Sequence, residues 1–82
     1  MSIQEQYENA HKFIYNDKAK VVKWFYKWQE VTVNEISMEL PTSQDEEGNI
    51  IEAIPTVYRC VLMEEDTKIA RNIDARDLEP IK

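Results

Sequence analysis

Residues 18–36 read KAKVVKWFYKWQEVTVNEI, a basic and aromatic stretch within a chain of formal charge −6. Ala19 and Val21 alternate with Lys20, and β-branched residues are frequent after the aromatic cluster. Such alternation indicates a half-buried strand, and β-branched side chains favour strands. The stretch therefore predicts two strands joined through residues 24–28, which contain no Gly, Pro or Asn to form a conventional turn.

The residues after 56 predict the rest of a sheet. Tyr58, Cys60 and Leu62 fall on one face of a strand over residues 57–63, because successive side chains point to opposite faces. Residues 67–73 can return as its antiparallel partner after a polar turn. Asp74 then begins a single tight turn before a last short segment, in which Pro80 requires an edge or a terminus.

The N-terminal segment predicts a helix. Ser2 and Glu5 have the spacing of a capping box. Apolar residues then recur at helical intervals, namely Ile3, Tyr7, Ala10 and Ile14. We therefore expect a short helix over about residues 3–12, with its apolar side chains packed against one open end of a barrel.

Residues 41–55 carry the only glycine, four acids and three isoleucines between two prolines. Because proline ends regular strands, residues 41–56 are predicted to form a long acidic loop or a hairpin extension. Long loops of compact domains are often binding elements, which makes Ile50 and Ile51 candidate partner contacts. In the alternative, the isoleucines of an extended hairpin pack back onto the core.

These elements predict a single domain over residues 1–82. A chain of 82 residues has room for one small core. Residues 1–14 form the helical segment, and residues 15–81 form four to five short strands that close into a small barrel. The expected fold class is therefore all-β with a short N-terminal helix.

Four short motifs resemble the KOW and SH3-like domain family over about residues 15–81. They are KVVK at 20–23, TVNEI at 32–36, YRCVL at 58–62 and DLEPI at 77–81. The resemblance implies a five-stranded SH3-like barrel, also similar to Tudor domains, that binds RNA, DNA or proteins. Family members usually carry glycine where this chain has Trp24, Trp28 and Val31. Since glycine permits tight turns and close approach to RNA, these replacements speak against a ribosomal type of RNA contact.

The chain lacks the sequence patterns of catalytic and metal sites. His11 and Cys60 are the only residues of their types, and they lack the spacing of a zinc site or of a nucleophile with its base. Gly48 is the only glycine, which excludes a glycine-rich phosphate loop. The acidic groups at 45–47 and 64–66 do not have the alternating ligands of a calcium loop. We therefore expect no enzymatic activity, no cofactor and no metal.

We favour a non-catalytic interaction module that binds a protein. Tryptophan is costly to expose and is enriched at the centres of interfaces. The predicted partner-binding residues are Trp24, Phe25, Tyr26, Lys27, Trp28, Ile50 and Ile51. The acidic remainder of the chain suits a basic partner surface, as expected of a phage- or mobile-element-type inhibitor or regulator of a host protein that handles nucleic acid. In a purely structural alternative, one of the tryptophans folds back to plug the barrel.

A second hypothesis is binding to single-stranded nucleic acid. Residues 11–28 hold five lysines and one aspartate, a local charge of +4. Lysines would contact phosphates while indoles stack on bases. The residues of this alternative site are Lys18, Lys20, Lys23, Lys27, Trp24 and Trp28. Acids elsewhere in the chain would repel a polyanion, so this hypothesis ranks second, and the lysines could equally solvate the outer face of a strand.

Cysteine usage and hydropathy indicate where the chain acts. Cys60 lies in an apolar run, which predicts a buried, reduced thiol and a cytoplasmic protein. No apolar run has the length of a membrane span, so we expect no membrane insertion. An open barrel edge or the isoleucines of residues 41–55 would support at most a weak homodimer of an otherwise monomeric protein.

Overall fold

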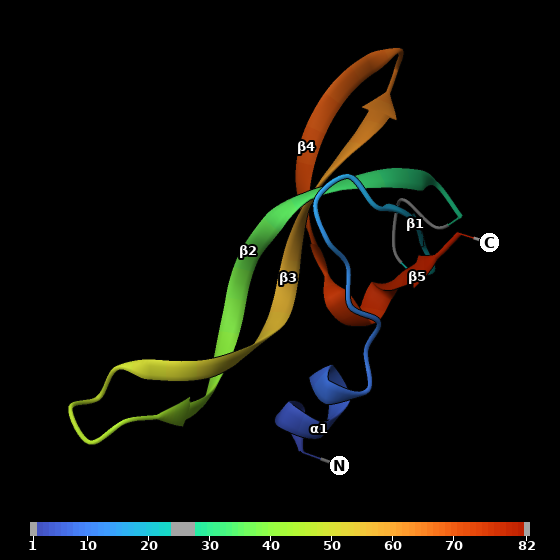
Figure 1. Ribbon diagram of the computed structural model, residues 1–82. Coiled ribbons are helices and arrows are strands. Elements are labelled where there is room, and N and C mark those ends of the chain that lie inside the picture. Colours follow the sequence, from blue (N-terminus) through green and yellow to red (C-terminus); the bar gives the residue numbers. More distant parts are fainter. Residues whose placement is uncertain (1, 24–27, 82) are drawn as a thin grey trace.

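The computed structural model describes residues 2–23 and 28–81, which form one antiparallel sheet of five strands with a short helix (Figure 1). The helix is α1 (Ile3–Glu8), and the strands are β1 (Lys18–Val21), β2 (Glu30–Gln44), β3 (Ile50–Glu64), β4 (Thr67–Asp74) and β5 (Leu78–Pro80). A single 3-10 turn, η2 (Ala75–Asp77), separates β4 from β5. The predicted β-rich class with an N-terminal helix is confirmed.

The sheet is open. Its strands lie in the order β4-β3-β2-β1-β5, so β4 and β5 form the two edges. The three residues of β5 all pair with β1, and among the described strands β5 has no pairing with β4. The sheet of the described residues is therefore not closed into the barrel that the sequence predicts.

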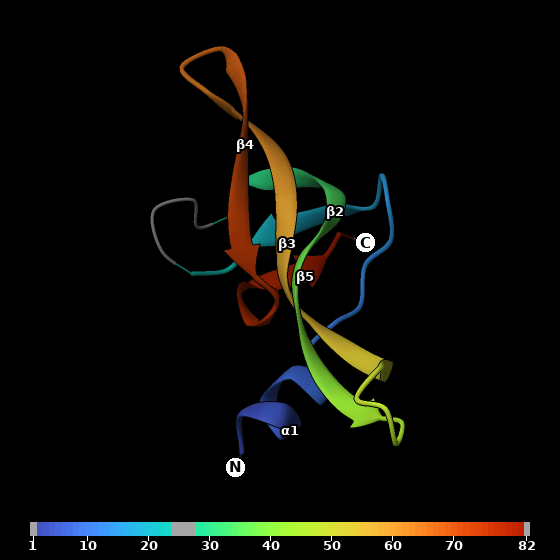
Figure 2. The same ribbon diagram turned by 90° about the vertical axis from the view of Figure 1, so that its left-hand side faces the viewer.

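The strands are also longer than predicted, since β2 and β3 have 15 residues each. β3 pairs with β2 along most of its length and with β4 from Val57 onward. The two hairpins leave the centre of the molecule in opposite directions, one toward the β3–β4 turn and one toward the β2–β3 tip (Figure 2). The molecule is elongated as a result, with extents of 49 × 25 × 21 Å.

Two prolines lie inside strands, where the sequence predicts that they end them. Pro41 pairs with Ala53, and Pro55 pairs with Glu39. Over residues 39–55, hereafter the arm, β2 and β3 pair with each other and no third described strand lies beside either. A residue without an N–H group is tolerated on such free edges and at bulges, and the register shifts next to both prolines. The segment 41–56 thus belongs to a hairpin whose connecting residues are 45–49.

The core lies where β1, the start of β2 and the second half of β3 cross. Ala19 and Val21 on β1 are buried, as are Val31 and Val33 on β2. The predicted shared face of Tyr58, Cys60 and Leu62 on β3 is confirmed, and it points inward, because all three residues are buried. Beyond Val33 the register of β2 shifts and its apolar residues reach the surface, with both Ile36 and Met38 exposed.

The helix is shorter than predicted but begins at the predicted cap. Ser2 Oγ accepts a hydrogen bond from the Glu5 backbone N–H at 3.2 Å, and the helix ends at Glu8 instead of near residue 12. Its only buried residue is Tyr7, so packing supports it at one point. Residues 9–14 are not helical, and Phe13 among them is buried. Its ring packs edge-on against the Tyr58 ring, with 5.4 Å between the ring centroids.

Tyr7 anchors the helix to η2. Its hydroxyl donates to Asp74 Oδ2 at 2.6 Å, and the Arg76 guanidinium lies 4.7 Å from the centre of its ring. Arg76 Nε and Nη2 donate to the two carboxylate oxygens of Asp74, each at 3.0 Å, and Nη1 donates to Gln6 Oε1 at 2.7 Å. In these contacts, the Tyr7–Asp74–Arg76 clamp, the hydrogen bonds from Tyr7 to Asp74 and from Arg76 to Gln6 join residues that are 67 and 70 positions apart in the chain.

Candidate functional site

Of the predicted contact residues, Trp24, Phe25, Tyr26 and Lys27 lie outside the described residues. The structure places the others on two surfaces. Trp28, Lys18, Lys20 and Lys23 lie on or beside β1 and the start of β2. Ile50 and Ile51 lie in the arm, where Ile50 pairs with Gln44 at the far end of β2. The structure therefore does not bring Trp28 together with the two isoleucines.

Trp28 is exposed and has an unusual backbone conformation. The residue is 65% exposed to solvent, and its backbone φ is +70°. Few bulky residues adopt a positive φ, because the side chain crowds the backbone. The conformation is held by backbone hydrogen bonds, from Trp28 N–H to Val21 O at 2.5 Å and from Val21 N–H to Gln29 O at 3.0 Å. Trp28 therefore lies on the surface and does not plug the core.

The lysines of the basic stretch lie beside polar and acidic partners. Lys18 Nζ donates to Thr32 Oγ1 at 2.8 Å across the β1–β2 pair. Lys20 Nζ lies 4.0 Å from Glu79 and 5.3 Å from the centre of the Trp28 ring. Lys23 Nζ lies 3.9 Å from Asp77. The positive charge that the sequence concentrates in residues 11–28 is thus partly balanced in space by carboxylates from η2 and β5.

The isoleucines of the arm divide between the core and the solvent. Ile54 is buried opposite Leu40, whereas Ile50 and Ile51 are 58% and 62% exposed. The tip is a compact turn built by Asp45, whose carboxylate accepts from the backbone N–H groups of Glu47 and Asn49 at 2.9 and 2.8 Å. These hydrogen bonds, led by the one from Asn49, lower the pKa of Asp45 despite slight desolvation. Gly48, at φ +87°, completes the turn.

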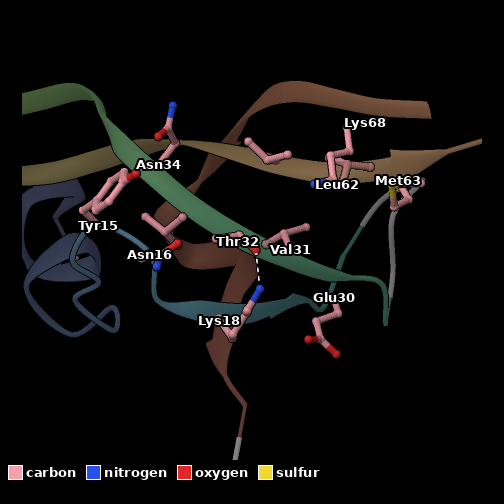
Figure 3. Close-up of a pocket in the computed structure, with 12 residues that line it drawn as sticks. Tyr15, Asn16, Lys18, Glu30, Val31, Thr32, Asn34, Leu62, Met63 and Lys68 are labelled. Atoms are coloured by element: carbon pink, nitrogen blue, oxygen red, sulfur yellow. Dashed lines mark hydrogen bonds between the residues drawn. The ribbon is translucent and has the colours of Figure 1, made fainter. Parts of the chain in front are cut away.

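An open groove of about 560 Å³ crosses β1, β2 and β3 (Figure 3). Tyr15 and Asn34 line one end of it, Met63 and Lys68 line the other, and Lys18 lies between them. Sequence reasoning identified Lys18 but missed the other four. For Tyr15 the sequence does carry a signal, because Asn16 and Asp17, which follow it, are residue types that favour turns.

That turn fixes Tyr15 beside β2. Asn16 adopts a φ of +75°, which asparagine tolerates better than most residues. Its N–H donates to Val33 O at 2.8 Å, and Val33 N–H donates to Asp17 O at 2.8 Å. The exposed Tyr15 ring is thereby held at the rim of the groove, next to Asn34 (Figure 3).

Cys60, the only cysteine, is buried in the core. Burial raises the pKa of the Cys60 thiol to about 11, so the sulfur is protonated at neutral pH. Within residues 2–23 and 28–81, no three His, Cys, Asp or Glu side chains gather where they could hold a metal ion. No helix in these ranges is long and apolar enough to cross a membrane.

No family model, curated protein or solved structure matches this chain. The resemblance to KOW and SH3-like domains therefore depends on the four short motifs of the sequence.

Proposed function

We propose that this protein is a non-catalytic interaction module that binds another protein, with Trp28 as an anchor of the contact. The observation that carries the proposal is the exposed indole at a positive φ. An L-residue in this conformation costs on the order of 1 kcal/mol, and such strained positions cluster at binding and catalytic sites. Tryptophan is also the side chain whose loss most often disrupts a protein interface.

We also propose that the open sheet is a variant of the SH3-like fold. Pairing of β1 with both β2 and β5 supports this assignment, as does the single helical turn before β5. The glycine-like φ of Trp28 supports it too, because the resemblance implies glycine at this position. In this view Trp28 replaced a glycine at a position where the backbone already had a positive φ.

Single-stranded nucleic acid is the second candidate. Lys20 lies over the Trp28 ring. In such an arrangement the indole can stack on a base while the lysine contacts the phosphate. However, Glu79 and Asp77 lie within about 4 Å of Lys20 and Lys23, and the chain carries a formal charge of −6. Both features oppose the approach of a polyanion, so a protein partner is favoured.

The first test is Trp28→Gly. Glycine adopts a φ of +70° without strain, so this variant should be as stable as the natural chain or more stable, by about 1 kcal/mol. It should nevertheless lose partner capture in a tagged pull-down from the native host, with and without nuclease. Thermal unfolding checks the first expectation, and mass spectrometry of the captured proteins checks the second.

Ile14→Ala is the matched control, because Ile14 is an exposed apolar residue outside the helix and the strands. Equal capture by Trp28→Gly and the natural chain would refute Trp28 as an anchor. Binding of a single-stranded oligonucleotide at low salt, abolished by Lys20→Glu with Lys23→Glu, would move the function to the second candidate.

A further inference from the structure

The arm combines one sign of charge with exposed apolar surface. Residues 29–58 contain no lysine, arginine or histidine. Within the arm, residues 39–55, the charged side chains are Glu39, Asp45, Glu46, Glu47 and Glu52, a charge of −5. Helix α1, which contacts β3, contributes the acids Glu5 and Glu8 and no base. No cation of the arm's own therefore offsets this negative field.

The two faces of the arm differ. Leu40 and Ile54 pair on the face turned toward the core, where Ile54 is buried. Pro41 pairs with Ala53 and neighbours Leu40 in the strand, so this pair lies on the opposite, outward face. Pro41 is exposed and Ala53 half-buried, and the exposed Ile51 lies near the tip. By the same alternation Glu39 and Pro55, which pair with each other, also lie on this face, so it combines apolar side chains with one carboxylate and leads to an acidic tip.

The arm packs on the core at its base, through Ile54, whereas Ile50 and Ile51 near its tip are exposed. Beyond Val57 toward the tip, β3 pairs only with β2 among the described strands. A two-stranded hairpin alone is marginally stable in water, so exposed apolar residues on it are best explained by a partner that covers them. Figures 1 and 2 show the arm extending away from β1, β5 and η2, where it is open to such a partner.

We propose that the arm docks into a basic groove with an apolar floor on a partner protein. The proposal rests on the proposed function as a protein-binding module, but it uses a surface separate from Trp28. Ile51 and the outward face would meet the floor, while the tip carboxylates would meet lysine or arginine on the rim. Charge complementarity of this kind mainly speeds association and excludes wrong partners.

Other occupants fit the charges less well. A symmetric contact between the arms of two copies would bring ten carboxylates together, twice the five of one arm, with no base among them. Nucleic acid carries the same sign of charge as the arm. A basic protein surface is the occupant that neutralises the arm.

The test uses the full, ¹⁵N-labelled chain and a short synthetic peptide that alternates lysine with isoleucine. Amide shifts should map to residues 39–55 and their immediate neighbours. Binding should weaken about tenfold between roughly 50 and 500 mM salt, because screening shortens the reach of the carboxylates. The same peptide with glutamate in place of lysine should not bind.

The variant Glu39→Gln/Glu46→Gln/Glu47→Gln/Glu52→Gln should bind the lysine peptide about tenfold more weakly. It leaves Asp45 in place, because Asp45 builds the turn. The matched control, Glu30→Gln/Glu64→Gln/Glu65→Gln/Asp66→Asn, changes the net charge by the same amount at exposed positions outside both the arm and α1, and should bind as the natural chain does. Ile51→Ser should weaken binding at both salt concentrations.

Several outcomes would overturn the inference. They are shifts centred on β1 and Trp28, equal binding by the two charge variants, no binding at low salt, and self-association of the arm in sedimentation experiments. Pull-downs with Trp28→Gly distinguish a wrong role for the arm from a wrong protein-binding function. If Trp28→Gly loses capture while the arm variants keep it, the protein-binding function stands and the role of the arm falls.

Discussion

Asp74 helps to attach the N-terminal helix to the sheet through its hydrogen bonds. It accepts hydrogen bonds from the Tyr7 hydroxyl and from three nitrogens of Arg76. Burial alone would raise the pKa of its carboxyl, but the hydrogen bonds from Arg76 and Tyr7 outweigh it and lower the pKa below 3.8. The carboxylate form is therefore the one that the folded protein favours.

This shift predicts how stability responds to acid. Because the pKa of Asp74 is lower in the folded than in the unfolded chain, its stabilisation is complete above the unfolded value of 3.8 and is lost as the pH falls through the folded value. Asp74→Asn should be less stable at pH 7 by about 1 kcal/mol, discounted for partial exposure, and its stability should fall less steeply in acid. Urea unfolding at a series of pH values measures both effects.

Asp77→Asn provides the opposing control. Burial and the nearby charge of Asp74 raise the pKa of Asp77, against the pull of Lys23 and Arg76. Its contribution to stability is therefore present in acid and is lost as the pH rises through the folded value. Removing this contribution should make the fall in acid steeper than in the natural chain. Parallel pH profiles for both variants would contradict the assigned pKa directions.

At the scale of single elements, the β3–β4 turn does not have the residues that its backbone conformation favours. Glu65 and Asp66 connect Glu64 to Thr67 with φ values of +51° and +65°. Two-residue hairpin turns with positive φ at both positions prefer Asn-Gly, and glutamate is a poor choice there.

Glu65→Asn with Asp66→Gly should therefore stabilise the protein by about 1 kcal/mol, which for a domain of this size raises Tm by roughly 4 to 8 °C. Differential scanning calorimetry provides the measurement. Glu46→Gly, at a tip position without a positive φ, is the control and should give no gain. An unchanged or lower Tm for the double variant would show that its turn is not strained.

Elements whose signals are local were predictable from the sequence. The alternation around Tyr58 placed the inward face of β3, and the Ser2 cap placed the start of α1. Positions of Pro41 and Pro55 inside strands were not predictable, because proline is tolerated there only through the absence of neighbouring strands.

At the scale of the whole molecule, the grouping of the candidate contact residues could not be predicted from the sequence. The sequence identified the exposed Trp28, Ile50 and Ile51, but the length of β2 separates them onto two surfaces. It could not foresee that Glu79 and Asp77 lie beside Lys20 and Lys23, because that pairing follows from the β1–β5 register. The groove between Tyr15 and Lys68 depends on tertiary contacts in the same way.

The buried thiol gives a test of the core as a whole. Cys60 is fully buried, and burial raises its pKa to about 11. A thiol reagent at neutral pH should therefore modify it only through open states of the core, at a rate that rises with urea. Ser37→Cys in a Cys60→Ala chain, with the exposed position 37, should react at once. Immediate labelling of the natural chain would show that the core is loose.

The absence of basic residues in the arm also affects how the protein can be analysed by proteolysis. Trypsin cleaves after lysine and arginine, and the chain has neither between Lys27 and Arg59. All of β2, the tip and the first half of β3 therefore remain in one tryptic fragment. A covalent crosslink or footprint on the arm would therefore be found in that fragment alone.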